Sequence, residues 1–302
     1  MDTSPTRPLL AIVGMTATGK TALAVRLIGA IPSVLISADS RQLYRGMDIV
    51  PGKDHPAGVP IAGIDLLDPD EPGSVAVWYD AVAPVIRTAW EAGKLPIVVG
   101  GTGLYVQALL GGVDTMSVPP DPALRARFAG ASAATLQAEL AQVSPDRLAQ
   151  MNDSDRANPR RLLRALEIAL APTPAPKSER ALAPAPVHIL GLRYAGHELQ
   201  EARIAQRVQA RLAAGALAET RALSTVAAPQ ALSALGYSQL QAHLAGKLSE
   251  GEMTAAWVQA EVAYAKRQKT WFAKLPGVTW YDAANLDPDQ VVQAVKAWYD
   301  RR

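Results

Sequence analysis

The 302-residue sequence contains no cysteine and only four histidines. The absence of cysteine excludes disulfides, thiolate-bound zinc, iron–sulfur clusters and thiol catalysis. The histidines do not have the spacing of a metal site; they are His55, His188, His197 and His243. No apolar run approaches the roughly 20 residues that a membrane-spanning helix needs, and the N-terminus does not have the form of a signal peptide. We therefore predict a cytoplasmic protein without a membrane segment.

Charged residues are few, at 19% of the chain, against 49% hydrophobic residues. This composition is typical of a globular protein and excludes wholesale disorder. The net charge of +2 excludes a strongly basic, histone-like protein. Basic and acidic side chains number 8 and 11 in residues 1–119, 9 and 7 in residues 120–187, and 13 and 10 in residues 188–302. A polyanionic partner therefore fits the later segments better than the first.

Short apolar strands alternate with helical patterns in residues 1–119. The expected strands are 9–13, 34–38 and 96–99, and the expected helices are 20–30, 74–93 and 102–110. This alternation predicts an α/β fold with a parallel sheet flanked by helices.

The rest of the chain suggests an inserted domain and a return to the core. Residues 120–187 are expected to form an all-helical insertion domain that ends in a proline-rich linker, Ala171–Val187. Residues 188–302 then complete the core with C-terminal helices. Their expected strands are 188–192 and 278–281, and their expected helices are 198–223, 231–244, 251–274 and 288–299.

The segment GMTATGKT matches the phosphate-binding pattern G-x-x-x-x-G-K-[ST] and lies between a strand and a helix, as that motif requires. It indicates a P-loop NTPase-like core, in which backbone N–H groups and a helix N-terminus surround phosphate. Lys20 would neutralise the terminal phosphates, and Thr21 would ligate Mg²⁺. We assign diphosphate binding to the whole loop: Gly14, Met15, Thr16, Ala17, Thr18, Gly19, Lys20 and Thr21.

Two further segments follow expected strands, where the active sites of parallel sheets gather. Asp39 follows the second strand, and its carboxylate could be a metal ligand, a general base or the cap of a helix. Gly100 and Gly101 precede Thr102, a sequence that allows close backbone approach to a ligand or a simple strand-to-helix turn.

Two basic segments have both a nucleic-acid interpretation and a structural one. The first segment holds three arginines, Arg160, Arg161 and Arg164, which could contact phosphate backbones. Alternatively, they form a solvated helix face on which Arg164 pairs with Glu167 or Asp155. The second segment holds aromatic residues at seven-residue intervals, which suit base stacking or a buried core face. These aromatics are Trp257, Tyr264 and Trp271, and the nearby bases are Lys266, Arg267 and Lys269.

Together and in this order, the motifs resemble those of the tRNA dimethylallyltransferase (tRNA isopentenyltransferase) family. The resemblance extends from Leu9 to Phe272 and rests on six segments. They are the phosphate loop, DSRQLY from Asp39, GGTGLY from Gly100, RLLRALE from Arg161, LGY from Leu235 and AKRQKTWF from Ala265.

The resemblance implies transfer of a dimethylallyl group from dimethylallyl diphosphate to the exocyclic N6 amine of adenosine 37, 3′-adjacent to the tRNA anticodon, with release of diphosphate. It implies that Asp39 accepts the amine proton, that Thr102 and Arg221 assist catalysis with Arg221 on the diphosphate, and that Mg²⁺ binds at Thr21. The expected partners of the monomer are the anticodon stem-loop and dimethylallyl diphosphate. The implied tRNA contacts are Asp39, Ser40, Arg41, Gln42, Thr102, Arg125, Arg160, Arg161, Arg164, Gly236, Tyr237, Lys266, Arg267, Gln268 and Trp271.

The alternatives are a dimethylallyltransferase acting on free adenylate, a P-loop kinase or ATPase, and a non-enzymatic RNA-binding protein. The basic insertion argues against the first, and the lack of a carboxylate after a long apolar strand argues against the second. The third leaves Lys20 and Asp39 without a task. The chain also departs from the family pattern at Val50-Pro51-Gly52-Lys53, whose role stays open, and at Ser233 and Ser238, where basic residues are usual.

Overall fold

The computed structural model describes residues 7–111, 116, 118–171, 182 and 184–301. The chain forms two compact units, one of Met1–Leu110 with Leu182–Arg302 and one of Gly111–Ala181. The sequence boundaries, after residues 119 and 187, follow changes in composition, whereas the contacts place both boundaries earlier. Most of the expected proline-rich linker, residues 172–181 and 183, lies outside the described residues.

The larger unit is built on a six-stranded parallel sheet with the order β3-β2-β4-β1-β5-β6. The predicted parallel α/β core flanked by helices is therefore confirmed. The two central strands, β4 and β1, are buried along their whole length, as expected for a sheet covered on both faces. The strands are β1 (Leu9–Gly14), β2 (Ser33–Ser37), β3 (Ile61–Ala62), β4 (Leu95–Val99), β5 (Val187–Arg193) and β6 (Val278–Asp282).

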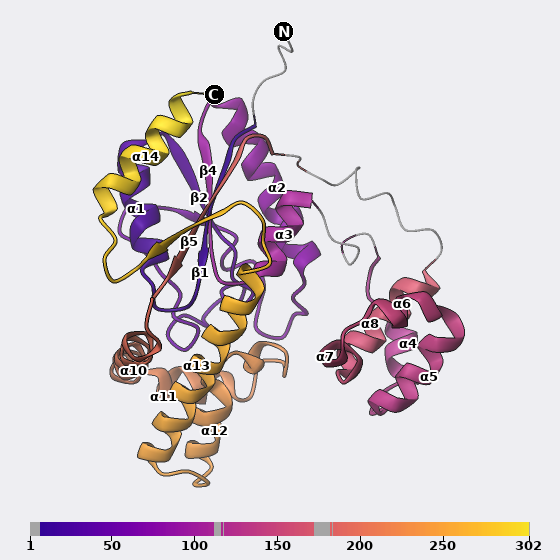
Figure 1. Cartoon of the computed structure of the whole chain (residues 1–302). Coiled ribbons are helices and arrows are strands. Elements are labelled where there is room, and N and C mark those ends of the chain that lie inside the picture. The colour runs from indigo at the N-terminus through magenta and orange to yellow at the C-terminus, as the bar shows by residue number, and fades with distance from the viewer. Residues whose placement is uncertain (1–6, 112–115, 117, 172–181, 183, 302) are drawn as a thin grey trace. The chain divides into compact units, whose positions relative to one another are not determined.

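Helices cover both faces of this sheet (Figure 1). On one face, α1 (Lys20–Ala30) and α14 (Pro288–Asp300) share an apolar core with the strands. On the other face lie α2 (Val75–Glu91) and α3 (Gly103–Gly111), where Trp78 stacks on Tyr105 with 4.5 Å between ring centroids. Ser74 caps α2 by accepting a hydrogen bond from the Val77 N–H.

Four further helices of this unit pack together: α10 (His197–Ala213), α11 (Ala216–Leu223), α12 (Tyr237–Leu244) and α13 (Glu250–Phe272). The prediction of one helix over 198–223 was wrong because Gly215, at φ 108°, ends α10 and starts α11 in a new direction. The prediction of a helix from 231 was also wrong: Ala231–Ser233 forms a 3₁₀ turn, and α12 begins after Gly236. No helix in the described residues is long and apolar enough to cross a membrane.

The smaller unit contains only helices among its described elements. They are α4 (Pro122–Arg127), α5 (Ala133–Val143), α6 (Pro145–Gln150), α7 (Asp153–Arg156) and α8 (Pro159–Leu170). Asp121, Ser132, Asn152 and Asn158 each cap the following helix through a side-chain oxygen. The unit has its own apolar core, which includes Leu136, Leu140 and Leu162.

Candidate active site

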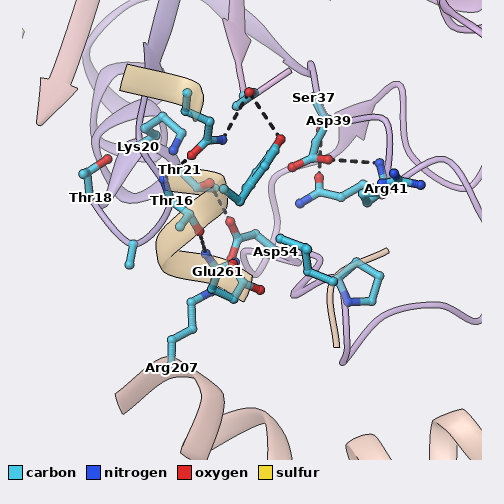
Figure 2. Close-up of a pocket in the computed structure, with 18 of the residues that line it drawn as sticks. Thr16, Thr18, Lys20, Thr21, Ser37, Asp39, Arg41, Asp54, Arg207 and Glu261 are labelled. Atoms are coloured by element: carbon cyan, nitrogen blue, oxygen red, sulfur yellow. Dashed lines mark hydrogen bonds between the residues drawn. The ribbon is translucent and has the colours of Figure 1, made fainter. Parts of the chain in front are cut away.

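A cavity of about 780 Å³ opens in the larger unit, where β1, β2 and β4 end (Figure 2). This is the edge at which parallel sheets bind their ligands. The lining comes from the phosphate loop, the turn after β2, residues 50–54, Ile61 of β3, the end of β4, residues 233–235, and the facing sides of α10 and α13.

The phosphate loop presents Thr16 to Thr21 to this cavity. Met15 lies buried behind them, and its carbonyl oxygen accepts hydrogen bonds from Thr18 Oγ1 (2.8 Å) and Lys20 Nζ (2.7 Å). Burial and the nearby Arg207 lower the pKa of Lys20 to about 8, although Asp39 and Asp54 partly oppose this shift. The ammonium group is therefore poorly solvated and is well placed to interact with an anion in the cavity.

Asp39 lies at the end of β2, half-buried, and faces the cavity. Its Oδ1 accepts a hydrogen bond from the Arg41 N–H (3.0 Å), which closes a local turn; no helix begins here, so the helix-cap interpretation was wrong. Burial raises the pKa of Asp39, against the opposing effects of that N–H and of Lys20. A carboxylate of raised pKa is a stronger proton acceptor, which favours the general-base interpretation.

Thr102 lies beside this aspartate segment although it does not line the cavity itself. Its Oγ1 accepts a hydrogen bond from the Ser40 N–H at 3.1 Å, and its own N–H donates to the Ala38 carbonyl at 3.1 Å. The two segments, more than sixty residues apart in sequence, are thus joined directly. Arg41 extends from the same turn to Ser233 Oγ (2.9 Å) at the rim of the cavity.

The hydroxyl of Thr21 donates to Asp54 Oδ2 at 2.5 Å. A carboxylate oxygen of Asp54 therefore lies beside the hydroxyl that the sequence assigns to Mg²⁺, and oxygens are the ligands that this ion prefers. Among the described residues, no group of three or more histidine, cysteine or acidic side chains could hold a metal. The site thus fits an ion held by one or two protein oxygens together with phosphate, and not a metal caged by protein alone.

Three arginines of α10 line the cavity, and the sequence interpretation missed them: Arg203, Arg207 and Arg211. Arg207 Nη1 donates to Thr16 Oγ1 at 2.8 Å, directly on the phosphate loop. Arg211 pairs with Glu261 of α13 at 2.8 Å, with both side chains 8% exposed. Burial and the neighbouring Arg207 lower the pKa of Arg211 to about 10. The four-residue spacing of these arginines places them on one helix face and could have identified them.

The structure does not place Arg221, the predicted catalytic arginine, among the residues that line the cavity. It lies on the exposed face of α11, whose buried face consists of Ala216, Thr220 and Leu223. Helix packing therefore turns Arg221 to solvent, and Arg207 is the arginine that contacts the phosphate loop.

The predicted RNA-binding residues of α13 divide into two groups. Arg267 and Gln268 line the cavity, whereas Lys266 and Trp271 are exposed on the helix outside it. Gln268 is almost fully buried: its Oε1 accepts from the Thr16 N–H (2.7 Å), and its Nε2 donates to the Gly101 carbonyl (3.1 Å). It therefore ties α13 to the phosphate loop and to the end of β4.

Burial changes the interpretation of several other predicted contacts. Gly236 is buried and Tyr237 is fully buried, with its hydroxyl donating to Glu219 at 2.7 Å, so neither presents a side chain to RNA. Trp257 is also fully buried, whereas Trp271 is 43% exposed. The row of aromatics at seven-residue intervals thus runs from the core to the surface.

Two arginines of the smaller unit, Arg125 and Arg164, contact Glu167, whose side chain is fully buried. Arg125 Nε donates to it at 2.7 Å, and Arg164 Nη1 at 2.5 Å. Burial alone would raise the pKa of Glu167, but these hydrogen bonds lower it below its usual value. Arg161 pairs with Asp155, and Arg160 is exposed. The pairing of Arg164 with Glu167, which the sequence offered as the structural alternative to RNA binding, is therefore present.

Comparison with known proteins gives one consistent result. The model of the IPP transferase family matches residues 42–275. The tRNA dimethylallyltransferases of Roseiflexus sp. (strain RS-1) and Symbiobacterium thermophilum are each 38% identical to the chain, over 97% and 96% of it and 99% and 95% of their own lengths.

Among solved structures, the tRNA isopentenylpyrophosphate transferase of Bacillus halodurans matches with a TM-score of 0.71 and 32% identity, over 97% of this chain and 95% of that one. A eukaryotic dimethylallyltransferase acting on tRNA has the same fold, with a TM-score of 0.80 and 22% identity over 98% and 80% of the two chains.

Proposed function

The chain belongs to the IPP transferase family of tRNA dimethylallyltransferases, and on that premise we propose that it transfers a dimethylallyl group from dimethylallyl diphosphate to N6 of adenosine 37 in tRNA. The observation that carries this proposal is that one cavity joins a phosphate loop to a carboxylate of raised pKa. Transfer breaks the carbon–oxygen bond of the donor, forms a carbon–nitrogen bond to N6, and releases diphosphate with the bonding electrons.

The phosphate loop, Lys20 and Arg207 would bind the diphosphate. Negative charge grows on this group as the carbon–oxygen bond breaks, so fixed positive charge stabilises the transition state more than the ground state. We add Arg207 to the diphosphate-binding groups because its guanidinium reaches Thr16 of the loop, and the assisting role of Arg221 stays a prediction. The N–H groups of Met15 and Thr16 are engaged by the Leu192 carbonyl and by Gln268, so phosphate would bind at the N–H groups later in the loop.

Asp39 would accept the N6 proton as the nitrogen attacks, with the adenine flipped out of its stack into the cavity. Its half-buried position supports this role, since burial raises the proton affinity of the carboxylate. Thr102 would help to position Asp39, because its hydroxyl accepts a hydrogen bond from Ser40 in the same turn.

Mg²⁺ would bind at the Thr21 hydroxyl, beside the carboxylate oxygen of Asp54. When bound, it would neutralise charge on the leaving diphosphate. Basic and aromatic side chains would contact tRNA: the partly exposed Arg41 and the exposed Arg160, Lys266, Arg267 and Trp271. A monomer located in the cytoplasm, where tRNA is used, fits this function.

The test is to incubate the protein with unmodified tRNA, Mg²⁺ and dimethylallyl diphosphate and to analyse the tRNA nucleosides by mass spectrometry. We expect a dimethylallyl adenosine, and we expect Asp39→Asn to reduce the rate about 10²- to 10⁴-fold. Asp68→Asn is the matched control, because Asp68 is exposed, pairs with Arg45 and lies outside the cavity lining. Unmodified adenosine after incubation with the wild-type protein would refute the proposal.

A further inference from the structure

The loop at residues 50–54, which departs from the family pattern, lies against the phosphate loop. Pro51 and Asp54 line the cavity, and Asp54 Oδ2 accepts the 2.5 Å hydrogen bond from Thr21. We propose that Asp54 is the metal-side carboxylate of this site, which acts with Thr21 on the Mg²⁺ of the diphosphate, and that the buried Arg211–Glu261 pair positions it. This inference rests on the proposed function, because it assumes that a diphosphate occupies the cavity.

The first argument concerns charge. A carboxylate beside a bound diphosphate repels it unless a cation lies between them. Asp54 is exposed and forms no ion pair with a basic side chain among the described residues. Its charge does interact with that of Lys20, but Lys20 also interacts with Asp39, so one ammonium group faces two carboxylates. In other phosphate-loop proteins, Mg²⁺ is held by the loop Ser or Thr together with an aspartate that follows a distant strand. Here β4, the strand beside β1, is followed by Gly100 and Gly101 and not by an aspartate, and Asp39 after β2 is assigned to the N6 proton. Asp54 is the carboxylate that contacts Thr21.

The second argument concerns how the loop is held. Arg211 Nη2 donates to the Pro51 carbonyl (3.1 Å), and Arg207 Nη2 donates to the Gly52 carbonyl (3.2 Å). Gly52 has φ +66°, and a Cβ at this position would lie 2.3 Å from Arg211 Nη2, so only glycine allows the loop to lie flat on the guanidinium groups.

Glu261 makes this arrangement of two adjacent arginines possible. It binds Arg211 at 2.8 Å where both side chains are nearly buried, and so offsets the repulsion between Arg211 and Arg207. Arg211 and Glu261 are therefore positioning residues: they act on the metal side of the site through the backbone of residues 51 and 52, and not through contact with reacting atoms.

The test is calorimetric titration of the full chain with inorganic diphosphate, once with a chelator and once with excess Mg²⁺. If Asp54 acts on the metal, Asp54→Asn should have opposite effects in the two conditions. Diphosphate should bind about threefold more tightly without Mg²⁺, because a repelling charge is gone. It should bind about tenfold more weakly with Mg²⁺, because an oxygen that orders the ion is lost. Asp68→Asn, which removes the same charge outside the cavity, should change neither value.

The positioning role is tested with the double substitution Arg211→Met with Glu261→Met, which replaces the buried pair by apolar side chains and avoids leaving one charge alone. It should reduce the Mg²⁺-dependent gain in diphosphate affinity as Asp54→Asn does. Combined with Asp54→Asn, it should cause no further reduction, because both act at the same point. A thermal melt of each variant confirms that it is folded.

Three outcomes would overturn the inference. One is that Asp54→Asn changes diphosphate affinity in the same direction with and without Mg²⁺, and another is that it changes neither affinity. The third is that the Arg211 and Glu261 substitutions add fully to Asp54→Asn. Failure of the wild-type protein to bind diphosphate in either condition would refute the proposed function as well, so the two failures can be told apart.

Discussion

Replacing Glu219 by glutamine should destabilise the protein out of proportion to the change of one atom. One carboxylate oxygen accepts the N–H groups of Asp48 (2.8 Å) and Ile49 (2.6 Å), and the other accepts the Val50 N–H (3.0 Å) and the Tyr237 hydroxyl (2.7 Å). These four bonds hold the start of the loop that carries Asp54. In the glutamine variant, one acceptor oxygen becomes an NH₂ donor.

The magnitude follows from which bonds are lost. Whichever way the amide is turned, at least one backbone N–H faces a donor, and in the less favourable orientation two do. A hydrogen bond to a charged group contributes about 1.5–3 kcal/mol, and a partly buried N–H left without an acceptor adds a desolvation cost. We therefore expect Glu219→Gln to lower the free energy of unfolding by about 2–4 kcal/mol. Tyr237→Phe, which removes one bond and leaves the three N–H groups in place, should cost about 1 kcal/mol.

Urea denaturation followed by tryptophan fluorescence measures both values, with wild type and the two variants at the same pH and salt. The expected order of stability is wild type, then Tyr237→Phe, then Glu219→Gln. If Glu219→Gln lies within about 0.5 kcal/mol of wild type, which is the usual range for surface substitutions, the carboxylate does not hold the loop and this reasoning is wrong.

Three further predictions concern ligand binding. Because the pKa of Lys20 is lowered to about 8, the affinity for diphosphate without Mg²⁺ should fall as the pH rises through that value. Lys20→Met should make this affinity independent of pH over the same range. An affinity of the wild-type protein that stays constant from about pH 7 to pH 9 would contradict the prediction. Arg160→Ala should weaken tRNA binding in a filter assay and leave the melting temperature of the protein unchanged. Arg164→Ala should also lower the melting temperature, because it removes an ion-pair partner of the buried Glu167. Equal melting temperatures for the two variants would count against this distinction. Trp271→Ala should raise the KM for tRNA severalfold and leave the KM for dimethylallyl diphosphate unchanged, because Trp271 is exposed outside the cavity. An equal rise in the two KM values would show that the substitution acts on the structure of the protein.

Much of the fold could be predicted from local patterns. The apolar run from Leu9, the glycine-bounded loop and the helix over Lys20–Ala30 are strong local signals, and the structure reproduces that helix at both ends. The two-residue β3 shows no strand pattern of its own, because its pairing with β2 depends on the rest of the sheet. The helix break at Gly215 was missed because a single glycine is compatible with a helix and its conformation is set by the packing of the two segments.

The site was predicted less completely than the fold. Motif residues such as Lys20 and Asp39 were identified because their chemistry follows from a short local pattern. The role assigned to Arg221 stays a prediction, since its position on the exposed face of α11 does not test it. Arg207 was missed because the sequence predicted one helix over 198–223 and does not show which of its arginines face the cavity. Tyr237 was assigned to RNA for a similar reason: only the packing against Glu219 shows that its hydroxyl is used inside the protein.

The most direct test of the central claim is to offer labelled dimethylallyl diphosphate, with Mg²⁺, to bulk unmodified tRNA and to AMP in parallel reactions. The account predicts label in tRNA, on N6 of adenosine next to the anticodon, and essentially none in AMP. It also predicts that Asp39→Asn slows the transfer about 10²- to 10⁴-fold while diphosphate is still bound. Label in AMP at a rate equal to that in tRNA, or no label in tRNA with the wild-type protein, would contradict it.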